Sequence, residues 1–155
     1  MSTPVFKRLS LEQFSQLLAR FPFTRRVNAV HMHHTWRPQR SDFRGHETIV
    51  AMWRFHTQQQ GWRDIAQHLT IDPEGWVWLG RNWNLPPVSA SGHNGNAQFG
   101  PFMFEMIGNF DRGCDPFDGA QREAALEVVA QVQARFGLPA DSLVFHNAMS
   151  TKTCP

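Results

Sequence analysis

Tyrosine is absent from this chain of 155 residues, and cysteine occurs only twice. Without tyrosine, any mechanism that needs a phenol is excluded, and two cysteines cannot form a disulfide-stapled scaffold. No stretch approaches the roughly 20 apolar residues of a membrane span, and residues 1–10 lack the apolar core of a secretory signal. We therefore expect a globular protein that is cytoplasmic as synthesised and has no membrane partner.

The chain does have an apolar fraction of 41%, a charged fraction of 18% and eight histidines. Its length fits one domain with one hydrophobic core, and we expect a monomer. The net charge of +2 is mild and no run of Lys and Arg occurs, so no nucleic-acid partner is indicated. The high histidine count suggests a metal site or a proton-transfer site.

Helical and extended patterns alternate along the chain. Helices are expected at 11–20, 47–60 and 119–136, and strands at 27–33, 65–71, 76–79, 99–107 and 143–146. Ser10 and Asp118 are placed to cap the first and last helices, and Gly137 ends the last one. This alternation predicts an α/β domain with a central mixed β-sheet flanked by helices. Residues 82–98 form a long polar loop, which in a small domain is often functional.

The C-terminal residues suggest a zinc site. Cys154 follows His146 at a distance that lets both side chains reach one ion, and zinc accepts imidazole nitrogen and thiolate sulfur. A third ligand is available among three histidines of the first predicted strand: His31, His33 and His34. The first two share one face of a strand, and the third lies on the other face. The alternative is an ordinary core histidine near a buried cysteine.

Seven short motifs follow one another along residues 27–155. They are Val30–Thr35 (ending His-His-Thr), Gly61–Ile65 (Gly-Trp-Arg-Asp-Ile), Ile71–Gly75, Gly80–Trp83 (Gly-Arg-Asn-Trp), Gly92-His93 with Asn96, Phe104–Asp111, and His146 to Cys154-Pro155. In order and spacing they resemble the zinc-dependent N-acetylmuramoyl-L-alanine amidases that share a fold with peptidoglycan recognition proteins, including phage amidase-type lysozymes. The resemblance implies that fold for residues 27–155. It assigns nothing to residues 1–26, which we expect to be an N-terminal helical segment of the same compact domain.

The resemblance also implies residue roles. His33, His146 and Cys154 would hold Zn²⁺, whose bound water would attack the amide between N-acetylmuramic acid and L-alanine. Lys152 would stabilise the oxyanion, and His93 would contact the substrate or the tetrahedral intermediate. Substrate binding would involve three further residues: Trp62, Arg81 and Asn96. The alternatives are that Trp62 and Trp83 are packing residues, that Arg81 pairs with Asp64, and that His93 is an exposed loop residue without a function.

Gln67 departs from the family pattern, because many members carry tyrosine at this position beside the zinc water. An amide can orient water or polarise a carbonyl, but it cannot act as a general base. A carboxylate could take that role, as in bacterial relatives that cleave muropeptides. The sequence leaves three candidates unranked: Glu47, Glu74 and Glu105. His68 is a further candidate, but strand alternation points it away from Gln67.

We therefore expect a zinc amidase that acts on peptidoglycan or muropeptides, reaching them by a route that the sequence does not reveal. One alternative is a catalytically inactive peptidoglycan-binding module that retains zinc, which Gln67 favours and which Cys154 and Lys152 oppose. Another is a zinc amidase that acts on a different acylated substrate.

Overall fold

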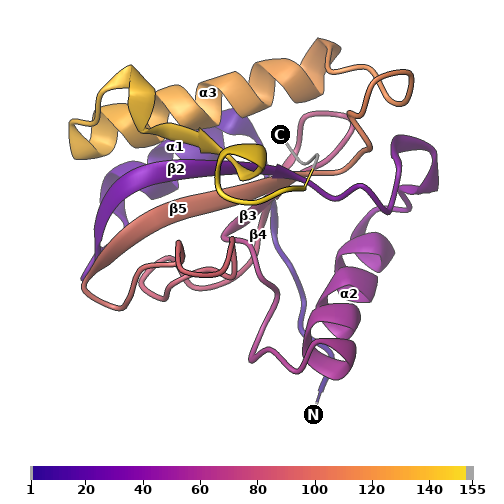
Figure 1. The fold of residues 1–155 in the computed structure, drawn as a ribbon, viewed down its shortest axis with the longest axis horizontal. Helices are drawn as coiled ribbons and strands as arrows, with labels where there is room; N and C mark the ends of the chain where they lie inside the picture. Colours follow the sequence, from indigo (N-terminus) through magenta and orange to yellow (C-terminus); the bar gives the residue numbers. More distant parts are fainter. Residues whose placement is uncertain (1, 153–155) are drawn as a thin grey trace.

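The computed structural model describes residues 2–152, which form a six-stranded mixed sheet with helices on both faces (Figure 1). The strands are β1 (Arg8–Leu9), β2 (Arg26–His34), β3 (Leu69–Ile71), β4 (Val77–Leu79), β5 (Phe99–Met106) and β6 (Leu143–Phe145). The helices are α1 (Leu11–Arg20), α2 (His46–Arg54) and α3 (Gly119–Phe136), with short helical turns at Arg40–Asp42, Phe55–Gln59, Ala140–Ser142 and His146–Ala148. The predicted fold class is confirmed.

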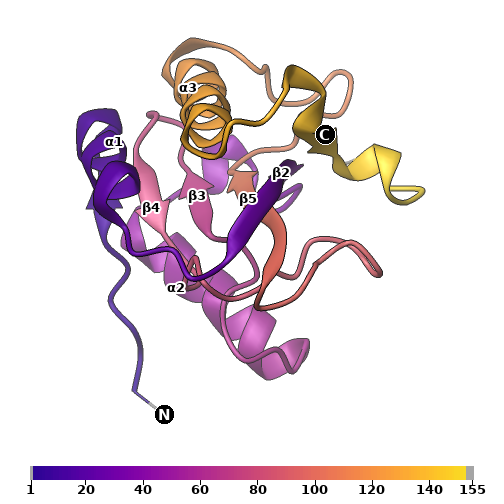
Figure 2. The same ribbon diagram turned by 90° about the vertical axis from the view of Figure 1, so that its left-hand side faces the viewer.

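The sheet order is β1-β4-β3-β5-β2-β6. Strands β3, β5, β2 and β6 run parallel to one another, and β4 runs antiparallel to both of its neighbours. Helices α1 and α3 cover one face and α2 lies against the other (Figures 1 and 2). The carboxyl ends of the four parallel strands therefore meet at one edge, which is where open α/β sheets bind ligands.

The N-terminal helix α1 belongs to the main core. Ser10 caps it through a reciprocal hydrogen-bond pair with Gln13, as the sequence predicts. Phe14 and Leu18 are fully buried against the sheet and α3. Trp83 is also buried here, with its ring 6.0 Å from that of Phe14, so the packing interpretation of Trp83 is correct. Strand β1, which is too short to produce a sequence pattern, adds a sixth strand beside β4.

Two predicted elements differ in detail from what is expected: the helix at 47–60 changes type along its length, and the strand at 65–71 is shortened to Leu69–Ile71. Helix α2 ends at Arg54 and continues as a π-helical turn, in which Thr57 Oγ1 donates to the carbonyl of Trp53. Residues 65–68 are irregular and buried instead of extended. Their backbone groups bond to several elements. The Ala66 N–H donates to His56 Nδ1 of the π-helical turn, the Ala66 carbonyl accepts from the Val88 N–H, and the His68 N–H donates to the Met103 carbonyl of β5.

The predicted C-terminal end of α3 is confirmed, but the predicted cap at its N-terminal end is wrong. Gly137 adopts the left-handed conformation, with φ of 63°, and ends the helix as expected. Asp118 precedes α3 but makes no capping hydrogen bond, so that prediction is wrong. Its carboxylate lies 3.5 Å from the guanidinium of Arg40 instead.

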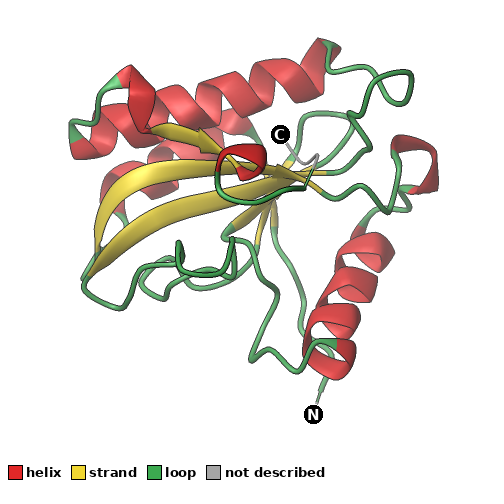
Figure 3. Ribbon diagram, in the orientation of Figure 1, coloured by secondary structure: helices red, strands yellow, loops and turns green. Residues whose placement is uncertain are grey.

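Figure 3 shows that loops account for much of the chain, including the long predicted loop between β4 and β5. Among residues 2–152, no helix combines the length and the apolarity that crossing a bilayer requires.

Truncation of Phe14 tests whether α1 is part of the cooperative core. Phe14→Ala should lower the free energy of unfolding by about 3–5 kcal/mol, because it leaves a cavity against Trp83. Leu126→Ala is the control, because Leu126 is 42% exposed on α3 and its truncation should cost less than about 0.5 kcal/mol. Denaturant titration measures both. A loss below about 1 kcal/mol for Phe14→Ala would show that α1 docks only weakly.

Candidate active site

Two histidines meet at the carboxyl edge of the sheet. The pairing of β2 with β6 sets Met32 opposite Phe145, so the next residues, His33 and His146, emerge side by side. Their ring centroids are 4.4 Å apart. The parallel register of two strands that are far apart in sequence thus brings together two of the three predicted zinc ligands.

Both imidazoles are held in the neutral form that binds metals. Burial lowers the pKa of His33 to about 3, with a further contribution from the charge of His146. Burial also lowers the pKa of His146, and Lys152 adds to the effect. The third predicted ligand, Cys154, lies outside the described residues. Within residues 2–152 no three His, Cys, Asp or Glu side chains are grouped so that they could hold a metal ion. Two adjacent neutral imidazoles fit a zinc site that takes its third ligand from beyond residue 152.

The other two histidines of β2 have different surroundings. His34 points to the opposite face, where its Nδ1 accepts the N–H of Phe110 at 2.9 Å. His31 shares the face of His33, and both rings contact one hydroxyl. Ser89 Oγ lies 2.7 Å from His31 Nδ1 and 2.8 Å from His33 Nε2. Sequence reasoning missed Ser89, because nothing distinguishes it from the other polar residues of the loop 82–98.

Glu105 is the carboxyl group nearest to this pair in the sheet register. It is the register partner of His33 on one side and of Thr70 on the other, so the three side chains form one row on one face. Burial raises the pKa of Glu105 to about 8. Among the described residues Glu105 has no hydrogen-bond or ion-pair partner. A carboxyl group with a raised pKa in a concave site is a candidate for acid–base chemistry.

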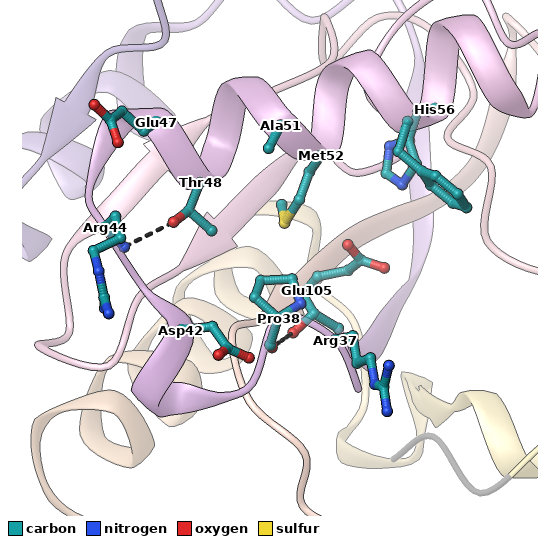
Figure 4. A pocket seen from close by; sticks show the side chains of 12 residues that line it. Arg37, Pro38, Asp42, Arg44, Glu47, Thr48, Ala51, Met52, His56 and Glu105 are labelled. Atoms are coloured by element: carbon teal, nitrogen blue, oxygen red, sulfur yellow. Dashed lines mark hydrogen bonds between the residues drawn. The ribbon is translucent and has the colours of Figure 1, made fainter.

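Glu105 is the member of this row that lines a cavity of about 560 Å³ between the sheet and α2. Figure 4 shows the Glu105 side chain pointing into it, between Met52 of α2 and Arg37 of the loop that joins β2 to α2. Glu47 also lines this cavity, at the start of α2, whereas Glu74 lies in the β3–β4 turn beside a different pocket. His68 is fully buried, with one ring nitrogen contacting the Met103 N–H and the other the Leu85 carbonyl. These positions favour Glu105 among the candidate bases.

Gln67 lies buried beside the same row. Its Nε2 donates to Thr70 Oγ1 at 2.9 Å, and its buried Oε1 has no hydrogen-bond partner within residues 2–152. A buried acceptor without a partner is costly unless a water or a ligand satisfies it. Gly80 lets the β4 end approach closely, because a Cβ there would overlap the Gln67 carbonyl. Gln67 is therefore held rigidly where it could bind a water or substrate N–H.

The remaining predicted site residues fall into two groups. Lys152 and His93 are both exposed. Lys152 contributes to the lowered pKa of His146, and His93 contributes to the lowered pKa of His31. The Trp62 ring packs against the ring of His56, with centroids 5.1 Å apart, and it is His56 that lines the cavity. These three residues surround the site, and their roles stay predictions.

Arg81 and Asn96 are used within the fold. Arg81 donates to the carbonyls of Ile65, Asp64 and Pro86, and no ion pair with Asp64 is formed among the described residues. The side-chain oxygen of Asn96 accepts from two backbone N–H groups of its own turn, at positions 98 and 99. These contacts favour structural roles for both residues, and substrate binding by them stays a prediction.

Comparison with solved structures defines the class to which this arrangement belongs. The Drosophila protein PGRP-LB matches with a TM-score of 0.70 and 22% identity, over 86% of this chain and 76% of that chain. PGRP-LE in complex with tracheal cytotoxin, a monomeric diaminopimelic acid-type peptidoglycan, matches with a TM-score of 0.68 and 20% identity, over 86% of this chain and 75% of that one. The fold is that of the peptidoglycan recognition proteins.

Sequence comparison identifies the family. The profile of the N-acetylmuramoyl-L-alanine amidase family matches residues 23–155, and the chain belongs to this family. Human N-acetylmuramoyl-L-alanine amidase is 28% identical over 131 residues, which cover 81% of this chain. The match spans only 22% of the human protein's length.

The raised pKa of Glu105 predicts a pH-dependent effect on stability. An unfolded chain releases this proton near pH 4.5, whereas the folded protein keeps it to about pH 8. Raising the pH between these values therefore destabilises the wild type. In chelator-treated protein, Glu105→Gln should be more stable than the wild type at pH 8, by about 1 kcal/mol or more, and the difference should shrink towards pH 5. Denaturant titrations at several pH values measure it, and a pH-independent difference would contradict the assignment.

Proposed function

We propose that the protein is a zinc-dependent N-acetylmuramoyl-L-alanine amidase that hydrolyses the amide between the lactyl group of N-acetylmuramic acid and L-alanine. The proposed substrate is peptidoglycan or its muropeptide fragments. The observation that carries the proposal is that His33 lies between two groups, its register partner Glu105, which lines the cavity, and His146, whose ring centroid is 4.4 Å from its own. Membership of the amidase family supports the reaction. The peptidoglycan fragment bound to PGRP-LE supports the substrate class.

His33, His146 and Cys154 would hold the zinc ion. When bound, zinc supplies an activated water and polarises the amide carbonyl. The two histidines are suited to this task because burial keeps both imidazoles neutral, and a cysteine thiolate completes a ligand set that zinc accepts.

Glu105 would move the protons. A group whose pKa lies near the working pH can both accept and donate a proton, which suits acid–base catalysis. Its carboxyl group, with a pKa raised to about 8, points into the cavity. It would take a proton from the attacking water and give one to the departing nitrogen of L-alanine. In this way Glu105 supplies the function that Gln67 cannot perform.

Lys152 and Gln67 would act on charge and orientation. The Lys152 ammonium, close enough to His146 to lower its pKa, would stabilise the negative charge that develops on the carbonyl oxygen. The buried Oε1 of Gln67 would accept a hydrogen bond from the water or from a substrate N–H. The cavity of about 560 Å³ lies in the range of small-ligand sites, about 300–1,000 Å³, so it accommodates part of a stem peptide.

The first test is mass spectrometry of purified muropeptides and intact sacculi incubated with the protein, with and without a zinc chelator. Chelator-sensitive release of stem peptides that begin with L-alanine is expected. Cys154→Ser should abolish release because it removes the thiolate ligand, whereas Cys114→Ser, at an exposed thiol, should not change it. Binding of sacculi without release by the zinc-loaded wild type would support the peptidoglycan-binding module instead. Release of other acyl groups would indicate a different substrate.

Substitution of the three candidate carboxylates tests the role of Glu105. Glu105→Gln should lower the rate of stem-peptide release by roughly 10²-fold or more, because the amide cannot transfer the proton. Glu74→Gln, in the β3–β4 turn, is the matched control and should keep the wild-type rate. Glu47→Gln, at the cavity wall, should affect KM more than kcat. A wild-type rate for Glu105→Gln would remove Glu105 from the chemistry.

A further inference from the structure

The hydroxyl of Ser89 connects two histidines of β2, only one of which is a proposed zinc ligand. Both contacts are short, 2.7 Å to His31 Nδ1 and 2.8 Å to His33 Nε2, and all three residues are buried. Ser89 lies on the long loop between β4 and β5. Its Oγ atom therefore connects this loop to both histidines of β2.

The position of Ser89 is fixed by a chain of mostly part-buried hydrogen bonds. Asn94 Oδ1 accepts the N–H groups of Ser89 and Ala90, at 2.7 and 3.0 Å, which closes the loop into a tight turn. Arg25, only 2% exposed, then donates to the carbonyls of Asn94, Asn96 and Pro101. Gly100 lies so close to this guanidinium that a Cβ there would overlap it. The buried Arg25 therefore holds the loop in place through these hydrogen bonds, which keeps Ser89 beside the rings of His31 and His33.

A count of protons restricts what the two rings can be. A serine hydroxyl has one hydrogen to donate, and each neutral imidazole carries one N–H and one lone pair. The serine oxygen also has two lone pairs and could accept from both rings, but its hydrogen would then have no acceptor among the described residues. We therefore take Ser89 to donate to one ring and to accept from the other. If it donates to His31 Nδ1 and accepts from His33 Nε2–H, both rings carry their proton on Nε2. If the roles are reversed, both carry it on Nδ1.

Only the first arrangement suits a metal ligand. In it, His33 keeps the lone pair of Nδ1, which can be given to a metal ion. In the reversed arrangement Nδ1 of His33 is protonated and the lone pair of Nε2 is used by Ser89, so the ring has nothing to give. Histidine binds a metal ion in its neutral form, so this count applies to the state of His33 that can act as a ligand.

We propose that Ser89 is a positioning residue for the metal ligand His33: its hydroxyl accepts Nε2–H from His33, donates to Nδ1 of His31, and so holds His33 in the tautomer that can bind a metal. The inference rests on the proposed function, because it takes His33 as a ligand. It adds that the β4–β5 loop, through Arg25, Asn94 and Ser89, prepares the site before the metal arrives. His31 takes part as the acceptor that orients the serine proton.

The first experiment reads the tautomers directly. Long-range ¹H–¹⁵N correlation spectra of chelator-treated wild-type protein at pH 7 report which nitrogen of each histidine carries the proton. We expect both His31 and His33 to be protonated on Nε2. Protonation of His33 on Nδ1 would overturn the proposal. This measurement needs no variant, so its result stands even if substitutions at position 89 impair folding.

The second experiment measures zinc affinity by competition with a chromophoric chelator. Ser89→Ala should weaken zinc binding by about 10- to 100-fold, the usual effect of removing a partner of a ligating histidine. The same variant should show His33 as a mixture of tautomers in the metal-free spectrum. Ser91→Ala is the matched control, because Ser91 is exposed on the same loop and makes no hydrogen bond with the described residues. Equal zinc affinity for Ser89→Ala and wild type would overturn the positioning role.

Failure of this inference is distinguishable from failure of the proposed function. If the wild type binds zinc with His33 protonated on Nε2 but releases no stem peptides, the proposed amidase activity fails and the role of Ser89 stands. If stem peptides are released in a chelator-sensitive way while His33 is protonated on Nδ1, the inference about Ser89 fails alone. If the wild type binds no zinc, both fail.

Discussion

The parallel pairing of β2 with β5 on one side and β6 on the other is the constraint on which the site depends. It sets Glu105 beside His33 and brings His146 next to the same ring, although the three residues lie far apart in sequence. Parallel strands share a carboxyl edge, and side chains in register project to the same face. A shift of one residue in either pairing would turn one group to the opposite face and separate the cluster.

The face that carries the site is more polar than its counterpart. On the opposite face, α1 and α3 cover a continuous apolar layer that includes Phe14, Trp83 and Phe102. On the site face, the sheet presents His31, His33, Thr70 and Glu105, and α2 covers only part of it. Buried polar groups are costly unless they are satisfied. The raised pKa of Glu105 and the Gln67 Oε1, which no described residue hydrogen-bonds, indicate that part of this cost remains within the site.

The long loop between β4 and β5 connects this polar face to a buried cation. Arg25 has no carboxylate partner among the described residues and is held by three backbone carbonyls, while burial lowers its pKa to about 10. A loop held in this way is a rigid support, not a mobile cover. This rigidity explains how a segment rich in Asn, Gly and Ser can place a single hydroxyl between two imidazoles.

The sequence by itself determined the fold class, the family and the element order apart from β1, because helix caps, hydrophobic periodicity and short ordered motifs are local properties of the chain. The bounds of α1 and α3 follow from Ser10 and Gly137 in this way. Only the tertiary structure separated Glu105 from Glu47 and Glu74, placed Arg81 and Asn96 in backbone contacts, and revealed Ser89. These assignments depend on strand register and on which loop packs under the sheet, and both arise from contacts between residues that are distant in sequence.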